Sequence, residues 1–305
     1  MFNQKKAYFY AIVVVLIWST VASAFKISLR YLNYLQLLFY ASLISLLILF
    51  IILIFQNKLS LLKTYSKKDY LYSGLLGFLN PCLYYAVLFK AYSLLPAQEA
   101  QPLNQTWAIV LALLSIIVLR QRIKLKSIIA LVISFIGVVI ISTRGHIFEL
   151  AFSSAPGAIL ALGSAFIWAF FWLYNLKDQR DAVAKLFLNF LFGTLFIIII
   201  VLVTKVSLKP TLTGFAGAAY VGIFEMGITF LLWLNALRLS KTTAQVSNMI
   251  YLVPFLSLVV IHFAVGEKIY VSTIAGLILI ISGILIQQYK TGVLRKDISD
   301  RLTNS

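Results

Sequence analysis

Ten apolar runs follow one another along the chain, each long enough to form a membrane-spanning helix. The hydrocarbon core of a bilayer is about 30 Å thick, and a helix needs about 20 residues to cross it. Of the 305 residues, 62% are hydrophobic and 11% charged, whereas a soluble domain carries about 25% charged residues. We therefore expect an all-α integral membrane protein with ten transmembrane helices, at about residues 8–29, 35–55, 70–93, 98–119, 125–143, 156–176, 183–204, 212–237, 242–265 and 270–289.

Lys and Arg are distributed unequally between the two sides of such a bundle. If both termini lie inside, the inner segments hold 19 of these residues and the outer loops hold 5. Cytoplasmic loops are enriched in Lys and Arg, so the bias predicts an even number of spans with both termini cytoplasmic. The formal charge of +17 then reflects topology, and we expect no nucleic-acid partner.

The two halves of the chain match weakly at a shift of 145–146 residues. Gly77 matches Gly222, and Ala91 matches Ala236. Each half has five expected spans, an odd number, so the two copies must cross the membrane in opposite directions. Inverted repeats with a site near mid-membrane are typical of secondary transporters. We expect a first repeat at 1–147, a second at 148–290 and a cytoplasmic tail at 291–305.

Two segments carry a resemblance to a known family. The stretches "LNQTWAIVLALLSIIVLRQRI" (103–123) and "NALRLSKTTAQVSNMIYLVPFLSLVVIHFAVGEKI" (235–269) resemble the two EamA domains of the drug/metabolite transporter superfamily. The stretch "PAQEAQPLNQTWAI" is similar to the subgroup of bacterial aromatic amino-acid exporters, although Gln105 replaces the usual Tyr and Ala108 the usual Pro. The resemblance implies inverted five-helix repeats around a central cavity, in the bacterial inner membrane. Members of the superfamily move amino acids, nucleotide-related metabolites, sugars and drugs.

Glu225 lies near the centre of the eighth span, far from any charged residue in the sequence. A charge at that depth costs at least about 2.5–3.5 kcal/mol, and an intramembrane ionisable residue is a functional candidate by default. At a shift of 145 its counterpart is Asn80, so both halves place a polar group at one equivalent point. Glu225 either faces a wet cavity, where it takes a proton or a cationic group, or is protonated and hydrogen-bonded to a neighbouring helix.

Other polar and aromatic residues collect at mid-depth in the first, third, fourth, sixth and ninth spans. Amides are costly on a lipid-facing helix, so we expect them to face inward. Interhelical hydrogen bonds, worth about 0.6 kcal/mol on average, and simple core packing are the alternative explanations. We expect the cavity wall to contain, besides Glu225, the residues Asn80, Tyr84, Trp18, Trp168, Gln101, Asn104, Gln105, Trp107, Gln245, Asn248 and Tyr251.

Lys90 and Glu99 lie near the outer surface on successive expected helices. They are candidates for a structural or gating ion pair, with separate solvation as the alternative. The glycines at 74, 77, 214, 217, 222 and 227 are expected to allow close helix packing.

The residue inventory narrows the chemistry. With only Cys82, His146 and His262, a disulfide framework is excluded and a Cys/His metal cluster is implausible. The chain has no phosphate-binding loop, so energy would come from an ion gradient or from the substrate's own gradient. Protons are a candidate coupling ion. No cofactor is expected, and the sequence carries no signal for an oligomeric state.

The leading interpretation is a secondary transporter that works by alternating access. Its expected substrate is a small metabolite, and an amino acid is the favoured class. Import or exchange of a cationic metabolite such as S-adenosylmethionine, which the resemblance also implies, is the alternative. An intramembrane enzyme would need a catalytic constellation, and Glu225 is the only acid at mid-span. A passive channel would need a continuous polar stripe, whereas the polar groups here concentrate near mid-depth.

Overall fold

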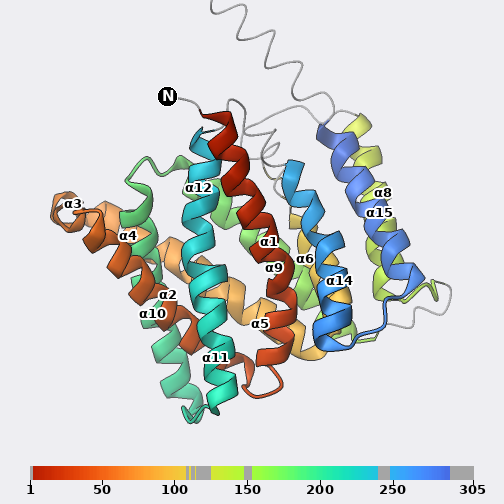
Figure 1. Ribbon diagram of the computed structural model, residues 1–305, viewed down its shortest axis with the longest axis horizontal. Helices are drawn as coiled ribbons and strands as arrows, with labels where there is room; N and C mark the ends of the chain where they lie inside the picture. Colours follow the sequence, from red (N-terminus) through yellow and green to blue (C-terminus); the bar gives the residue numbers. More distant parts are fainter. Residues whose placement is uncertain are drawn as a thin grey trace, which may run out of the picture.

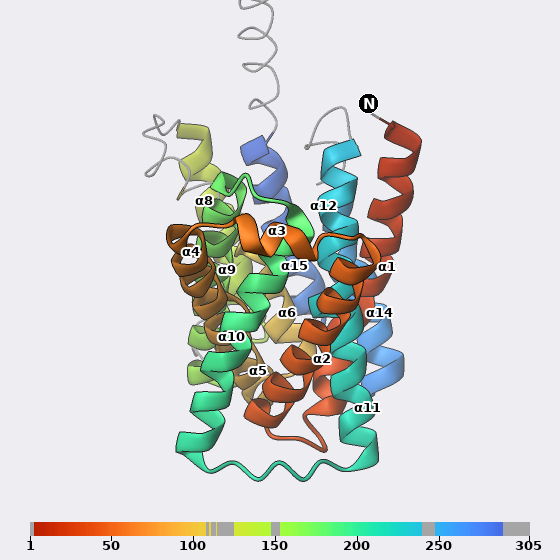
Figure 2. The ribbon, with the colours of Figure 1, turned by 90° about the vertical axis from the view of Figure 1, so that its left-hand side faces the viewer.

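The computed structural model describes residues 3–107, 110, 114, 125–147, 153–239 and 248–288. This part of the chain is helical and contains no strand, which confirms the all-α prediction. Figure 1 shows the helices running side by side as one bundle. Figure 2 places the start of α1 and the 205–211 loop at opposite ends of that bundle.

The helices follow one another with short connections. In chain order they are α1 (Gln4–Ser28), α2 (Tyr34–Phe55), α3 (Leu59–Thr64), α4 (Lys67–Gly77), η1 (Phe78–Leu83), α5 (Tyr84–Leu94), α6 (Ala97–Gln105), α8 (Leu125–Ser142), α9 (Ala155–Lys177), α10 (Ala182–Thr204), α11 (Leu212–Tyr220), η2 (Val221–Ile228), α12 (Thr229–Leu239), η3 (Asn248–Leu252), α14 (Val253–Val265) and α15 (Val271–Gln288).

Six helices in the described residues are long and apolar enough to cross a membrane by length and composition: Gln4–Ser28, Tyr34–Phe55, Lys67–Leu94, Ala155–Asn175, Ala182–Thr204 and Leu212–Ala236. Shorter apolar helices occupy Val132–Ile141, Val253–Val265 and Val271–Gly283. The expected spans near 98–119 and 242–265 fall partly outside the described residues. The structure therefore supports six spans plus shorter helices, and the count of ten remains a prediction.

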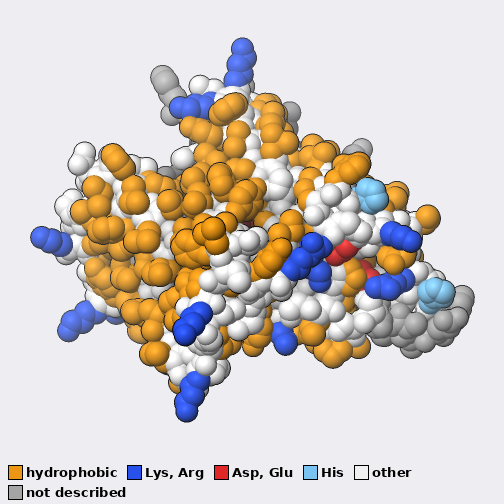
Figure 3. Space-filling view, turned by 60° about the horizontal axis from the view of Figure 1, so that its bottom comes forward, with side chains coloured by type: hydrophobic (Ala, Val, Ile, Leu, Met, Phe, Trp, Pro, Cys, Tyr) orange, Lys and Arg blue, Asp and Glu red, His pale blue; other side chains and the backbone are white. Residues whose placement is uncertain are grey.

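The outer surface of the bundle is apolar. Phe55, Leu212 and Phe263 are each more than 80% exposed. Figure 3 shows orange hydrophobic side chains over much of one face, with Lys and Arg projecting at several points of its edge. Such a surface suits lipid, because a helix satisfies its own backbone hydrogen bonds and can present apolar side chains to hydrocarbon.

Polar side chains mark where several helices begin. Asn33 caps α2 and Ser66 caps α4, each in a reciprocal capping box with the residue three positions on. Ser154 caps α9 and Thr211 caps α11. These caps supply acceptors to backbone N–H groups that have no partner inside the helix.

Each helix of one half packs on the helices of the other half that correspond to the partners of its own counterpart. Helix α1 packs on α12 and α14 of the second half, while α9 packs on α5 and α6 of the first half. Likewise α2 packs on α11 and η2, and α10 packs on α4 and η1. Helices α8 and α15 pair with each other. These exchanged contacts are those expected of a duplicated fold.

Glycine allows the backbones to approach at equivalent points. A Cβ on Gly77 would lie 2.7 Å from the backbone nitrogen of Gly193, and a Cβ on Gly222 would lie 2.6 Å from the carbonyl oxygen of Ala41. The expectation of close packing is thus confirmed at these two glycines. It is wrong at Gly74, where an added Cβ would meet nothing within 4 Å.

Both equivalent spans are interrupted at the same point. Segment η1 is a kink between α4 and α5: Pro81 has no N–H to donate, and Asn80 leaves the helical region with φ −151° and ψ 120°. Segment η2 is a π-helical stretch that includes Gly222 and Gly227. The two interruptions overlap at the shift of 145 residues, and they carry Asn80 and Glu225. π-Helical segments such as η2 occur frequently at functional sites.

Candidate functional site

An internal cavity of about 60 Å³ lies between the two halves of the bundle. Its wall comes from α1, α5, α6, α9, η2, η3 and α14, so the first, third and fourth expected spans of the first half and three spans of the second half all contribute. Eight of the residues expected at a cavity are brought together there: Trp18, Tyr84, Gln101, Asn104, Gln105, Trp107, Trp168 and Glu225.

The remaining expected residues are placed otherwise. Asn80 does not line this cavity; it is 0% exposed and sits at the interruption between α4 and α5. The extended backbone at Asn80 and the ring of Pro81 turn this segment towards α10. Gln245 and the side chains of Asn248 and Tyr251 lie outside the described residues.

Glu225 reaches the cavity from η2 and is 7% exposed. Its Oε1 atom accepts a hydrogen bond from the hydroxyl of Tyr85 at 3.0 Å. Its Oε2 atom has no hydrogen-bond partner among the described residues. The Tyr85 hydroxyl therefore anchors one oxygen of the carboxylate, and the indole of Trp18 lies near the carboxylate as well.

Two more cavity residues carry polar atoms without a partner in the described part of the chain. They are Nε1 of Trp18, a donor, and Oε1 of Gln101, an acceptor. Buried polar atoms are normally hydrogen-bonded, so unpaired ones on the wall of one cavity are consistent with a polar ligand.

A short hydrogen-bonded chain fixes the amide side of the wall. The Tyr84 hydroxyl donates to Oδ1 of Asn104 at 3.3 Å, and Nδ2 of Asn104 donates to Oγ of Ser164 at 2.8 Å. Nε1 of Trp107 donates to Oε1 of Gln105 at 3.1 Å. These bonds orient four of the expected residues without using Oε2 of Glu225 or Oε1 of Gln101.

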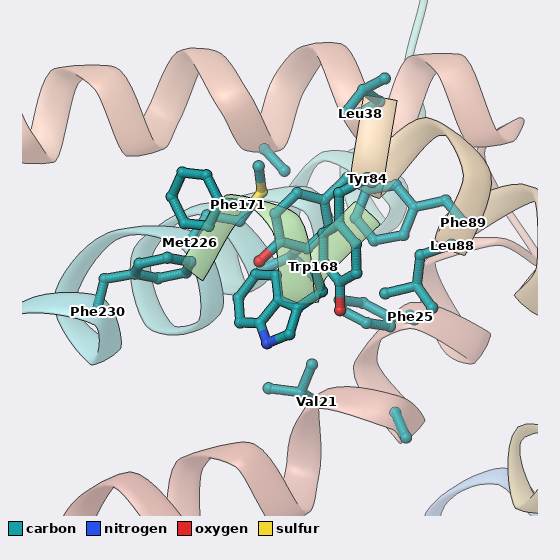
Figure 4. Packing of buried hydrophobic residues seen from close by; sticks show 14 of the residues in the cluster. Val21, Phe25, Leu38, Tyr84, Leu88, Phe89, Trp168, Phe171, Met226 and Phe230 are labelled. Atoms are coloured by element: carbon teal, nitrogen blue, oxygen red, sulfur yellow. The ribbon is translucent and has the colours of Figure 1, made fainter. Parts of the chain in front are cut away.

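Aromatic and aliphatic side chains form the rest of the wall. Figure 4 shows Trp168 between Met226 and Phe230 on one side and Tyr84 and Leu88 on the other. The ring centroids of Tyr84 and Trp168 are 4.5 Å apart. Close-packed rings hold the cavity in shape, and their faces carry the negative charge density that attracts cations.

The expected pair of Lys90 and Glu99 is not formed. Oε1 of Glu99 is instead 2.8 Å from Nε of Arg144, and Oε2 accepts a hydrogen bond from Ser153. Lys90 lies over the ring of Tyr34, with its Nζ 5.1 Å from the ring centroid. The hydrogen bond from Arg144 to Glu99 raises the pKa of that guanidinium above its ordinary value. The fold brings Arg144 close to Glu99. The prediction from the sequence considered only charges on neighbouring segments.

A cluster at the end of the bundle that carries the 94–97 and 266–270 segments was not expected from the sequence. Because the predicted topology would put this end outside, we call the cluster the outer seal (Lys26, Gln98, Glu99, Arg144 and Glu267). The Glu267 carboxylate accepts hydrogen bonds from the backbone N–H groups of Ala97 at 2.9 Å and Gln98 at 3.1 Å. It therefore caps α6 from the opposite half of the chain.

Lys26 and Gln98 join the outer seal to neighbouring segments. Nζ of Lys26 donates to the carbonyls of Tyr92 at 2.9 Å and Leu95 at 2.6 Å. The side chain of Gln98 bonds to the backbone of Lys268 and Tyr270. A hollow of about 370 Å³ opens beside these residues, and Figure 3 shows acidic side chains set among Lys and Arg on this end. The one sequence signal for Glu267 is its position directly after Gly266, a glycine that ends α14 in the left-handed conformation.

The bundle of apolar helices and the central polar cavity define a multi-pass membrane transporter. The chain belongs to the EamA-like transporter family, which matches residues 5–143 and again residues 155–287. The family resemblance read from the sequence is confirmed at this level, and the two matches correspond to the duplicated fold.

Relatives agree with this assignment, and a solved structure shares the fold. An uncharacterized transporter of Clostridium kluyveri is 27% identical over 222 residues, covering 70% of this chain and 71% of the relative. The uncharacterized transporter of Archaeoglobus fulgidus is 25% identical over 94% of this chain and 99% of its own length. A crystal structure of a protein 19% identical in sequence has the same fold, with a TM-score of 0.64 over 96% of this chain and 99% of that one.

Proposed function

We propose that this protein is a secondary transporter of the bacterial inner membrane that moves a small organic molecule with a protonated amine, most of all an amino acid. The observation that carries the proposal is the set of unpaired atoms on one cavity wall. Oε2 of Glu225 and Oε1 of Gln101 are acceptors that suit an ammonium group. Nε1 of Trp18 is a donor that lies near the Glu225 carboxylate. The two acceptors match the ammonium of an amino-acid head group.

The energetics support a cationic group at Glu225. A carboxylate inside a membrane is costly unless it is paired or neutralised, and the described residues give it only neutral partners, the hydroxyl of Tyr85 and the nearby indole of Trp18. Either a proton or the substrate amine would neutralise it. A site that holds one or the other in turn can exchange a proton for substrate, which is a direct route to coupling.

The size of the cavity indicates a closed conformation. Its volume of about 60 Å³ is well below the ~300–1,000 Å³ of typical ligand pockets. Substrate entry would therefore need the helices around Trp168 and Tyr84 to move apart, as expected for alternating access between inverted repeats.

A bulkier cationic metabolite such as S-adenosylmethionine is the second candidate. The observation in its favour is the combination of one carboxylate with aromatic faces on the same wall, which is the usual protein environment for a cation that cannot lose its charge.

Uptake into proteoliposomes tests the proposal. The protein would be offered labelled amino acids, nucleosides and S-adenosylmethionine, with and without a pH gradient. Glu225→Gln keeps the shape and removes the charge, so gradient-driven uptake of the preferred substrate should fall at least tenfold while expression stays unchanged. Met226→Leu, a buried neighbour outside the cavity wall, is the matched control and should transport normally. Normal uptake by Glu225→Gln under every gradient would remove Glu225 from the mechanism.

A further inference from the structure

Two buried asparagines at the contact between α10 and the α4–η1 segment have no hydrogen-bond partner among the described residues. Asn80 lies on η1 and Asn189 on α10; both are 0% exposed, and both polar atoms of each amide are unpaired. The hydroxyls of Ser73 on α4 and Thr194 on α10 are unpaired as well. An unsatisfied buried polar group costs about 1–3 kcal/mol, so this contact favours a polar occupant.

The two helices approach each other closely at this place. A Cβ on Gly193 would lie 2.7 Å from the carbonyl oxygen of Gly77 and 2.7 Å from Cγ of Pro81. Asn80 directly precedes Pro81, and Asn189 lies four residues, about one turn, before Gly193. Both asparagines therefore lie within about one turn of the same crossing point.

The ligands available at this crossing are neutral oxygens. Neither 73–84 nor 186–197 contains an Asp, Glu, Lys, Arg or His, so no ionised side chain from these segments competes for the amides. Pro81 has no N–H, so the helix ladder loses one donor here, and the carbonyl end of α4 carries the partial negative charge of a helix C-terminus. Amide, hydroxyl and carbonyl oxygens suit a hard cation. Calcium and magnesium sites add carboxylates, which these segments lack.

We propose that this contact, the amide junction (Ser73, Asn80, Asn189 and Thr194), binds a monovalent alkali cation of the size of Na⁺. Interrupted helices whose carbonyl ends face such an ion are an established way of binding Na⁺ inside a membrane. The junction is distinct from the central cavity, because none of its four residues lines the cavity wall. The two equivalent interruptions then have separate tasks, with neutral oxygens for an inorganic cation in one half and a carboxylate for an organic group in the other.

Thermal unfolding of the purified, detergent-solubilised protein tests the site without any transport assay. NaCl would be titrated against choline chloride at constant ionic strength, with KCl as a second comparison. A ligand that binds only the folded state raises the Tm in a saturable way, so the wild-type Tm should rise with NaCl and reach a plateau. Asn80→Ala and Asn189→Ala should abolish this response. Thr194→Val, which keeps the side-chain shape, should raise the half-saturating Na⁺ concentration about tenfold or more, as is typical for loss of a group around a metal site.

The controls decide between the outcomes. Ser45→Ala removes a buried, unpaired hydroxyl from α2, outside the amide junction, and should keep the full Na⁺ response. A wild-type Tm that responds equally to NaCl and choline chloride would show that the junction holds only water and would overturn the proposal. An equal response to KCl would overturn the assignment to Na⁺. If the alanine variants do not fold, Thr194→Val decides, and an unchanged half-saturating concentration in that variant rejects the site.

Discussion

The hydroxyl of Tyr85, from the first half of the chain, donates a hydrogen bond to Oε1 of Glu225, from the second half, at 3.0 Å. Tyr85 is 0% exposed, so water does not compete for this bond. The contact joins the interrupted third spans of the two repeats, α4–η1–α5 and α11–η2–α12, to each other. It also anchors one oxygen of the carboxylate at the cavity.

Tyr85→Phe should therefore impair transport through the orientation of Glu225. Loss of a hydrogen bond to a charged group costs about 1.5–3 kcal/mol, which corresponds to a roughly tenfold to hundredfold loss in kcat/KM for uptake. Phe fills the same volume, so the protein should still fold. Uptake and Tm would be measured together, with Phe89→Leu as a control for repacking of the same buried helix. Uptake at the wild-type level in Tyr85→Phe would mean that Glu225 needs no positioning.

Both termini are predicted to be cytoplasmic. A reporter fused after Ser305 that is active only in the periplasm should stay silent, and the same reporter in the 205–211 loop should be active. Figures 1 and 2 place that loop at the end opposite to the end of α15 and the start of α1, so a reporter in the loop and one after α15 are expected on different sides of the membrane. The reverse pattern would overturn the orientation derived from the Lys and Arg distribution.

The cavity residues are predicted to be reachable by water during the transport cycle. Single cysteines at Gln101, Tyr84, Trp168 and Asn248, with Cys82 replaced, should react with a small water-soluble thiol reagent, and substrate should slow the reaction. Cys82 is buried and free, so its replacement by Ala removes the background signal. Four inert positions would identify these residues as packing elements.

The outer seal is predicted to hold one side of the cavity closed. Glu267→Gln weakens the cap on α6, since an amide oxygen accepts hydrogen bonds less strongly than a carboxylate. A cysteine at Tyr92, which lines the cavity towards the seal, should then react several-fold faster with a reagent added from outside. His262→Gln, next to the seal and exposed, serves as the control. An unchanged rate in Glu267→Gln would show that the cap does not restrict access.

Asp181 is predicted to make the stability of the protein depend on pH. Partial burial opposes ionisation of its carboxyl, but hydrogen bonds from Lys58 and from the backbone of Ala184 outweigh burial and hold its pKa below the ordinary value. A pKa that is lower in the folded state contributes stability above the unfolded value of about 3.9, and this contribution is lost as the pH falls through the folded value.

Asp181→Ala removes both the cap of α10 and the ion pair with Lys58, which is 2.8 Å long. A lost cap costs about 0.5–2 kcal/mol, so the variant should unfold at a lower temperature at pH 7. The difference from wild type should shrink below pH 4. Asp181→Asn, which can still cap, should lose less. A difference that is the same at pH 7 and pH 3 would contradict the role of the charge.

Periodicity and composition predicted the helices because each apolar run is a local property. Eight of the expected polar and aromatic residues, among them Glu225, Gln101 and Asn104, lie on one cavity wall, and their role in binding substrate stays a prediction. Pro81 marked one helix interruption, whereas nothing but glycines marked the other. The outer seal could not be predicted, because Glu267 binds backbone N–H groups 170 and 169 residues away. The pairing of Lys90 with Glu99 was wrong for the same reason, since it assumed that neighbours in sequence are neighbours in space.

The paired interruptions η1 and η2 also bear on the kinetics of a duplicated fold. Two identical copies in opposite orientations would have equal barriers for opening to either face of the membrane. Asn80 in one copy and Glu225 in the other make the two interruptions chemically unequal. A difference at a single pair of positions is therefore enough to make the two opening rates unequal.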